Sequence, residues 1–296
     1  MSDENVHEYN IMLCGSARAG KSTLINALCN RTMIETSSIL ESCAKTITCY
    51  TFNDSHYIES KVFITKFQTN FCEPPDIDSW TEDEVKSYVK EIKERTNPLC
   101  MIYCASPGSY TKIPQLEWLI EACLDEQICV ALVCTNMWIS TNRYNIRDDF
   151  NKILSKYLKQ TKEEDGITYY GDNNALVAMV NSEKYIDNEL GVDEKICGIN
   201  ELIYGIITSL KDDKGLGWLY TISNNESFWI TKKSKVANLF NKTVDDVWSL
   251  ISDITRDLKE RNIALYKKSN INRKTPIIPE QHIVIRKKNS VSCTIL

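Results

Sequence analysis

The chain has 296 residues, of which 43% are hydrophobic and 25% are charged, a balance that is ordinary for a soluble globular protein. This length allows one large α/β domain with an appendage, or two small domains. The formal net charge of −5 argues against nucleic acid as the main partner, because binding to phosphates requires a basic face.

Cysteine placement and the absence of long apolar runs favour a cytoplasmic protein. Four of the twelve cysteines lie within or beside apolar runs, where cysteine behaves as a small buried hydrophobe: Cys100, Cys104, Cys129 and Cys134. The first residues are acidic and polar, unlike a signal peptide, and no apolar run reaches the roughly 18 residues that a membrane span needs. We expect reduced thiols in the cytoplasm and no disulfide framework.

The first predicted unit is a strand, a glycine-containing loop and a helix, at residues 9–14, 15–22 and 23–29. The loop reads Gly15-Ser16-Ala17-Arg18-Ala19-Gly20-Lys21-Ser22 and matches G-x-x-x-x-G-K-[ST], the phosphate-binding loop. Its glycines let backbone N–H groups close on phosphate oxygens, and the helix N-terminus adds a favourable dipole. In this motif Lys21 contacts the β- and γ-phosphates and the Ser22 hydroxyl binds Mg²⁺. The alternative is a glycine turn with a surface lysine.

The next segments predict a hairpin and a capped helix. Residues 32–42 are polar and loop-like, whereas 46–52 and about 57–72 predict antiparallel strands joined by a turn at 53–55. A proline-containing loop at 73–80 follows. Thr81 and Glu84 then form a predicted capping box for a helix whose apolar stripe is Val85, Val89 and Ile92.

The middle of the chain predicts an α/β fold. Continuous apolar runs at 99–104 and 128–134 are typical of strands covered on both faces of a parallel sheet. Further helices are predicted at 114–127, 144–160 and 196–210, and one further core strand is predicted at 175–180. This alternation predicts a three-layer, doubly wound, mostly parallel sheet of the P-loop NTPase type, with ligands at the C-terminal ends of the strands.

The C-terminal part differs in character. Residues 233–261 predict an amphipathic helix, which either forms a coiled-coil seam or packs on the nucleotide domain. We expect a nucleotide-binding domain at 1–212, a helical appendage at 213–265 and a flexible basic tail at 266–296. The last residues, Cys293-Thr294-Ile295-Leu296, form a C-a-a-X box that predicts prenylation of Cys293. With the basic residues Arg286-Lys287-Lys288 it predicts attachment to the cytosolic face of a membrane, chance occurrence of a short motif being the alternative.

The phosphate loop and the helix sequence after it, Ser22-Thr23-Leu24-Ile25-Asn26-Ala27-Leu28, resemble the G domain of P-loop GTPases, in the branch of septins and AIG1-type immunity-associated GTPases. The resemblance covers roughly residues 9–210. It implies binding of GTP or GDP with Mg²⁺, the phosphates being held by residues 15–23.

The family's D-x-P-G motif is matched only in altered form, at Glu73-Pro74-Pro75-Asp76. The resemblance implies that Glu73 serves as the carboxylate near the metal ion. Asp76 replaces the glycine that meets the γ-phosphate, and its negative charge would repel that group. This alignment implies weak or absent hydrolysis, whereas the alternative is an ordinary proline loop.

The family's base-reading motif, N/T-K-x-D, is matched by Thr135-Asn136-Met137-Trp138. Trp138 replaces the aspartate that reads guanine, and its indole either stacks on any base or packs at the strand end. The family's serine-containing base loop is matched by Asn181-Ser182-Glu183-Lys184, so that Ser182 would border the base. For the Mg²⁺-binding switch threonine the candidates are Thr46 and Thr48, but a register beginning at Ser42 would place Ala44 there.

The expected function is that of a membrane-attached GTP-binding protein with slow hydrolysis or none. A non-hydrolysing adaptor with the G domain as an interaction surface is the second alternative, and a P-loop small-molecule kinase is the third. The kinase would need an arginine-bearing lid, and the sequence has no such cluster. The protein partner and oligomeric state stay open, a nucleotide-dependent homodimer being one alternative.

Overall fold

The computed structural model describes residues 5–31, 38–42, 45–52, 58–60, 63–74, 79–108, 110, 114–189, 191–210 and 212–240. The predicted turn at 53–55, Ala44, Asp76 and the basic tail with Cys293 lie outside these residues.

The N-terminal half of the described chain contains β1 Asn5–Cys14, α1 Lys21–Cys29, β2 Ser38–Ser42, β3 Lys45–Phe52, β4 Ile58–Ser60, β5 Phe63–Glu73, α2 Glu82–Thr96, β6 Cys100–Ala105 and α3 Pro114–Asp125. After these come β7 Cys129–Cys134, α4 Arg143–Tyr157, β8 Gln160–Glu164, β9 Ile167–Tyr170 and β10 Ala175–Met179. The last described elements are β11 Tyr185–Asp187, β12 Val192–Glu194, α5 Ile199–Ser209, α6 Asp212–Thr221 and α7 Glu226–Leu239.

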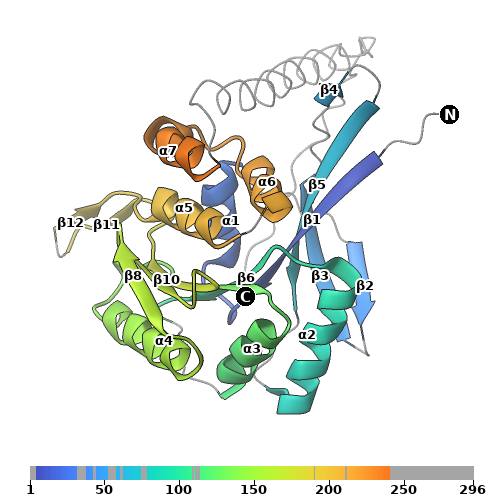
Figure 1. Ribbon diagram of the computed structural model, residues 1–296. Helices are drawn as coiled ribbons and strands as arrows, with labels where there is room; N and C mark the ends of the chain where they lie inside the picture. Colours follow the sequence, from blue (N-terminus) through green and yellow to red (C-terminus); the bar gives the residue numbers. More distant parts are fainter. Residues whose placement is uncertain are drawn as a thin grey trace, which may run out of the picture. The chain divides into compact units, whose positions relative to one another are not determined.

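One mixed sheet organises these elements (Figure 1), and its order in the described part of the chain is β2-β3-β5-β1-β6-β7-β10-β9-β8. The central strands β5, β1, β6, β7 and β10 are parallel neighbours. The outer strands are antiparallel. The predicted mostly parallel, doubly wound sheet is confirmed. Because the chain passes to β5 on one side of β1 and to β6 on the other, the C-terminal end of β1 lies at a topological switch point.

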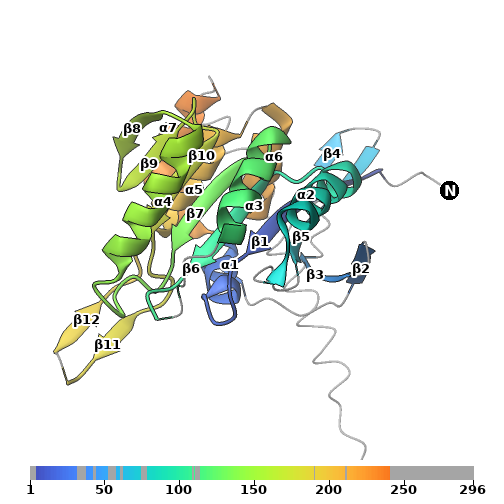
Figure 2. The ribbon, with the colours of Figure 1, turned by 90° about the horizontal axis from the view of Figure 1, so that it is seen from below.

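Helices cover both faces of the sheet, so the predicted three layers are confirmed (Figure 2). Along β1, Ile11 and Leu13 belong to the core shared with α1, α5, α6 and α7, whereas Met12 and Cys14 belong to the core shared with α2, α3 and α4. All residues of β6 and β7 are buried, as their continuous apolar sequences predict. The two-sided burial fixes the strand ends that carry the phosphate loop.

The start of α2 agrees with the predicted capping box. The Thr81 Oγ1 atom accepts a hydrogen bond from the Glu84 backbone N–H at 3.3 Å, and Glu84 Oε2 accepts one from the Thr81 N–H at 2.7 Å. The predicted apolar stripe of Val85, Val89 and Ile92 is buried.

Two strand regions differ from the sequence prediction. β2 lies in the segment predicted as a loop, and the hairpin β8–β9 follows the helix predicted at 144–160, in a segment for which no strand was predicted. Both β2 and β8 are edge strands, and β8 is largely exposed. β8 is rich in charged residues and β2 is short and mostly polar, so both lack the apolar alternation by which strands are recognised.

The helix predicted at 233–261 overlaps α7, which begins earlier than predicted, at Glu226, and is described as far as Leu239. Residues 241–261 of the predicted helix lie outside the described residues. Its N-terminus is set by Asn225, whose side chain accepts a hydrogen bond from the Phe228 N–H at 3.0 Å. Trp218 of α6 and Phe228 of α7 are buried in the same core as α1 and α5, so this described segment packs on the nucleotide domain. No helix among residues 5–240 that the structure describes is long and apolar enough to cross a membrane.

A cluster of ion pairs fastens α7 to the sheet. Lys232 lies 2.9 Å from Asp165 Oδ2 and 3.1 Å from Glu201 Oε1, while Lys235 lies 3.0 Å from Glu164 Oε1 and 2.9 Å from Asp165 Oδ2. Hydrogen bonds from Lys232 and then Lys235 lower the pKa of Asp165 to about 2. The turn between β8 and β9 is thereby connected to α7.

We predict that Asp165→Asn lowers the free energy of unfolding by less than about 1 kcal/mol at pH 7, because the Asp165 side chain is 40% exposed and solvent screens the pair. Since folding lowers the pKa of Asp165 from 3.8 to about 2, the stabilisation is complete above about pH 5 and is lost progressively as the pH falls through 2. Urea unfolding of both proteins at several pH values measures the difference. The exposed Asp148→Asn variant is the control, and a difference that persists at the lowest pH would contradict the assignment.

Candidate nucleotide site

The loop between β1 and α1 has the backbone geometry of an anion-binding loop. Gly15, Arg18 and Gly20 all have positive φ, at 131°, 63° and 75°. A Cβ atom on Gly15 would clash with the Cys104 carbonyl oxygen of β6, so only glycine fits there. Alternation of left- and right-handed residues brings successive N–H groups to one side of a loop, where they can bind an anion.

The other loop residues have distinct positions. Ser16 is half-buried and its carbonyl accepts a hydrogen bond from the Ala19 N–H at 3.2 Å. Ala19 is buried, whereas Ala17 and Arg18 are exposed. The loop is therefore anchored on its inner side, with Arg18 at its outer edge.

Lys21 lies folded over the loop. Its Nζ atom donates to the Gly15 carbonyl at 2.6 Å and to the Ser16 carbonyl at 2.9 Å, and it forms an ion pair with Glu73 Oε1 at 2.8 Å. The Lys21 side chain is only 10% exposed. Glu73 ends β5, which pairs with β1, so the sheet brings together two residues that the sequence analysis assigned to one site. The ammonium group has three acceptors for its three N–H bonds.

Thr135 connects the phosphate loop to the neighbouring strands. Its Oγ1 atom donates to the Ala19 carbonyl at 2.6 Å and lies 3.2 Å from the Ala105 carbonyl of β6. Asn136 has a positive φ of 47°, and its Nδ2 atom donates to Ser106 Oγ at 3.4 Å. Both predicted residues thus lie next to the phosphate loop, and the Thr135 hydroxyl holds the loop through its hydrogen bond to the Ala19 carbonyl.

Trp138 lies against a cation. The Arg143 guanidinium carbon is 4.8 Å from the centroid of the indole, within the range of a cation–π interaction. Arg143 Nη1 also donates to the Met137 carbonyl at 3.1 Å, which fixes the guanidinium on the loop. The Trp138 Nε1 atom is buried, and no described residue accepts its hydrogen bond. Stacking of a base on Trp138 stays a prediction.

The candidate metal ligands are only partly gathered. Ser22 is exposed in the first turn of α1. In the antiparallel register Thr48 lies opposite Glu73, and Thr46 pairs with Glu41 of β2. The described residues contain no group of three or more His, Cys, Asp or Glu side chains that could hold a metal ion. Mg²⁺ at a phosphate site does not need one, because it keeps several waters and binds phosphate oxygens with one or two protein groups.

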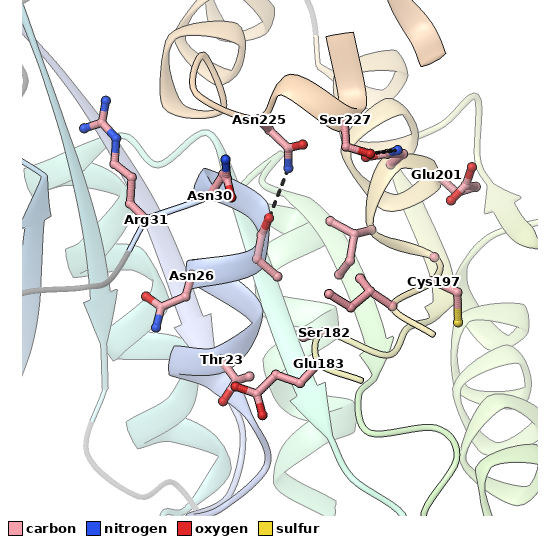
Figure 3. Close-up of a pocket in the computed structure, with 15 residues that line it drawn as sticks. Thr23, Asn26, Asn30, Arg31, Ser182, Glu183, Cys197, Glu201, Asn225 and Ser227 are labelled. Carbon is pink, nitrogen blue, oxygen red and sulfur yellow. Dashed lines mark hydrogen bonds between the residues drawn. The ribbon is translucent and has the colours of Figure 1, made fainter. Parts of the chain in front are cut away.

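A polar pocket of about 700 Å³ lies beside α1, and we call it the α1–α5 pocket (Figure 3). It is lined by residues of α1, the loop after β10 and the starts of α5 and α7, among them Thr23, Asn26, Asn30, Ser182, Glu183 and Glu201. The Ser182 Oγ atom is buried, and no described residue pairs with it. Sequence reasoning identified Thr23 and Ser182 but missed the rest. The available signal was the polar spacing of Thr23, Asn26 and Asn30 along one helix face.

A second pocket, of about 680 Å³, includes Lys93 and Lys214 among its lining residues. Lys214 donates to the Pro98 carbonyl at 2.9 Å, and burial, followed by the charge of Lys93, lowers the pKa of Lys214. The C-terminal ends of α2, α3 and α5 also contribute to this pocket. The lysines offset the negative ends of those helix dipoles, so a structural role accounts for them.

No protein-family model matches the sequence, and no curated protein does. Three similar solved structures are a bacterial selenocysteine-specific elongation factor EF-Sec, the G domain of the T. maritima FeoB iron transporter, and the elongation factor SelB from Methanococcus maripaludis in complex with the GTP analogue GppNHp. EF-Sec has 13% identity and a TM-score of 0.37 over 68% of this chain and 28% of that chain. The FeoB domain has 16% identity and a TM-score of 0.34 over 69% of this chain and 99% of the FeoB chain. SelB has 13% identity and a TM-score of 0.34 over 60% of this chain and 30% of the SelB chain.

The chain therefore spans less than a third of the two elongation-factor chains. These similarities are remote, and the fold assignment rests on the chain's own sheet. A mostly parallel sheet with a glycine-containing loop and a helix directly after its central strand β1 is the α/β architecture of a P-loop NTPase domain.

We predict that Thr135→Val lowers the free energy of unfolding by about 1–3 kcal/mol and weakens nucleotide binding, because the buried Ala19 carbonyl loses its donor. Thr135→Ser keeps the hydroxyl and should stay close to the unaltered protein on both counts. Urea unfolding and calorimetric titration measure the two effects. Equal behaviour of the valine and serine variants would show that the hydroxyl does not support the loop.

Proposed function

We propose that the chain binds a nucleoside triphosphate with Mg²⁺, GTP being the expected nucleotide, and hydrolyses it slowly or not at all. The observation that carries this proposal is the backbone of residues 15–20, together with Lys21 held over it. The loop lies at the switch point of the sheet and at the N-terminus of α1, where the helix dipole favours phosphate.

Each loop residue has a proposed task. Lys21 would contact the β- and γ-phosphates, and the exposed Ser22 hydroxyl would be a ligand of Mg²⁺. Glu73 supplies a carboxylate next to Lys21, and Thr46 or Thr48 on β3 would complete the metal site. When bound, Mg²⁺ neutralises part of the charge on the phosphates.

Slow turnover is proposed because the D-x-P-G motif is altered at Glu73-Pro74-Pro75-Asp76. Asp76 stands where the motif has the glycine that meets the γ-phosphate, and its negative charge would repel that group. A non-hydrolysing adaptor with a nucleotide-stabilised surface is the second candidate. It differs from a slow GTPase in one measurable respect, the release of phosphate.

The finer parts of the proposal rest on sequence motifs. We assign the chain to the septin and AIG1-type branch from the phosphate loop and the residues that follow it. Where Cys293-Thr294-Ile295-Leu296 are the last residues of the mature protein, prenylation of Cys293 and the nearby basic residues would bring the domain to a membrane.

We predict that calorimetry with GTP, GDP and ATP detects binding to the unaltered chain and that Lys21→Ala weakens it by about 100-fold, because two charge-assisted contacts with phosphate are lost. Lys162→Ala, which removes an exposed lysine of β8, is the matched control. Binding by the Lys21→Ala variant at unchanged affinity would rule out this site. Phosphate release in the same samples separates a slow GTPase from an adaptor.

A second prediction concerns Glu73→Gln. Because Glu73 competes with phosphates for Lys21, its neutralisation should strengthen the binding of metal-free triphosphate in EDTA by about tenfold. The gain on adding Mg²⁺ should become smaller, since the variant lacks a carboxylate near the metal ion. Glu8→Gln, at an exposed position of β1, is the control. Unchanged affinity in EDTA would show that the ion pair does not oppose binding.

A further inference from the structure

We propose that Glu183 is the guanine-reading residue and that the α1–α5 pocket holds the nucleoside. Glu183 would take over the carboxylate function that is missing where Trp138 stands. This inference rests on the proposed function, because it concerns the base of a nucleotide whose phosphates occupy residues 15–22.

The pocket is continuous with the phosphate loop along one face of α1. Thr23, Asn26, Ala27 and Asn30 line it, and their spacing of three or four residues places them on the same side of the helix. Thr23 directly follows Ser22, the last residue of the loop motif. A nucleoside attached to phosphates on the loop can therefore extend along this face. The volume of about 700 Å³ lies within the range of small-molecule sites.

The loop that carries Glu183 is fixed at its base. Asn181 and Cys197 exchange two backbone hydrogen bonds, at 2.9 and 3.0 Å. The Asn181 side chain also donates to the Glu183 carbonyl, which shapes the turn after β10. Figure 3 shows Glu183 extending from this loop toward Thr23 at the start of α1. The carboxylate thus comes from a constrained loop and lies at the pocket wall.

Glu183 is also the carboxylate at the α1–α5 pocket that has no ion-pair partner among the described residues. Among the described residues that line the α1–α5 pocket, Glu183 and Glu201 are acidic. Glu201 is paired with Lys232 at 3.1 Å, whereas no described cation pairs with Glu183. A carboxylate has two acceptor oxygens and no donor, so it can accept from the N1–H and N2–H₂ groups of guanine together. Adenine presents an acceptor at N1, which a carboxylate would repel.

Ser182 adds an independent indication that a ligand belongs here. Ser182 is one of the pocket's lining residues, it is 6% exposed, and its hydroxyl is buried without a hydrogen-bond partner among the described residues. Buried polar groups are rarely left unpaired, and rotation of the Ser182 side chain toward the pocket would let a ligand supply the missing partner. A hydroxyl can donate to a base or ribose oxygen as well as accept from one.

The loop after β7 is less suited to reading the base. Thr135 is occupied with the phosphate loop and β6, and Asn136 bonds to Ser106. Trp138 and Arg143 offer donors and an aromatic face but no carboxylate. Stacking discriminates poorly between bases, so guanine selectivity requires an acceptor from elsewhere.

The test is calorimetric titration of the full chain with Mg²⁺ and GTP, ITP or ATP. Inosine lacks the N2 amino group, so the ratio of GTP to ITP affinity reports the carboxylate contact directly. We expect GTP to bind more tightly than ITP and ATP, and Glu183→Gln to reduce the preference for GTP over ITP by about 10- to 100-fold. ATP affinity should not fall in this variant, because the repulsion between the carboxylate and adenine N1 is removed. Glu201→Gln, at the same pocket, should keep the preference, and Glu183→Asp should retain part of it.

The outcomes are distinct. Loss of the preference in Glu183→Gln but not in Glu201→Gln supports the proposal. A preference that survives in Glu183→Gln, or equal affinities of the unaltered chain for GTP and ITP, overturns it while leaving phosphate-loop binding intact. Failure of the unaltered chain to bind any triphosphate would instead contradict the proposed function. Thermal unfolding of each variant verifies that the exposed side chain was replaced without loss of the fold.

Discussion

The candidate site depends on how closely the phosphate loop approaches the strands next to β1. Gly15 lies against the Cys104 carbonyl of β6, and Thr135 bonds to the Ala19 carbonyl at 2.6 Å. Both contacts require β6 and β7 to keep their position relative to β1. That position is set by cores on both faces of the sheet, where a misplaced methylene group costs on the order of 1 kcal/mol. The loop geometry is therefore a consequence of packing as much as of its own glycines.

Under the proposed function, the ion pair between Lys21 and Glu73 would couple the binding of phosphate to the binding of the metal ion. With three acceptors around its ammonium group, Lys21 must exchange at least one for a phosphate oxygen. A cation near Glu73 would weaken its hold on Lys21 and so favour phosphate binding. By thermodynamic linkage, bound phosphate would then favour the cation to the same extent. The Glu73 side chain is one methylene group longer than the aspartate of the D-x-P-G motif. Through its ion pair with Lys21 it would therefore affect the relative affinities for metal-free and metal-bound nucleotide.

Sequence patterns predicted those elements whose burial is uniform or whose ends carry local signals. β6 and β7 are apolar throughout, and the α2 capping box uses residues three positions apart. The strands β2 and β8 were missed because their stability comes from backbone pairing at a sheet edge. In the site, Lys21, Glu73 and Thr135 belong to sequence motifs and could be predicted. The α1–α5 pocket joins α1 to chain segments more than 150 residues away, and no local pattern records such proximity.

Under the proposed function, phosphate binding and base reading would be separable, because they would use different side chains. In the loop after β7, the Thr135 hydroxyl supports the phosphate loop from the inside, and Trp138 lies at the outer end of the same loop against Arg143. Trp138 stands where the base-reading motif has an aspartate, and this replacement leaves the contact between Thr135 and the Ala19 carbonyl in place. Phosphate binding would therefore not depend on which residue reads the base. The loop after β10 approaches the same face of α1 and is held by its own bonds to Cys197. An acceptor placed there can therefore restore base selectivity without any change in the phosphate loop.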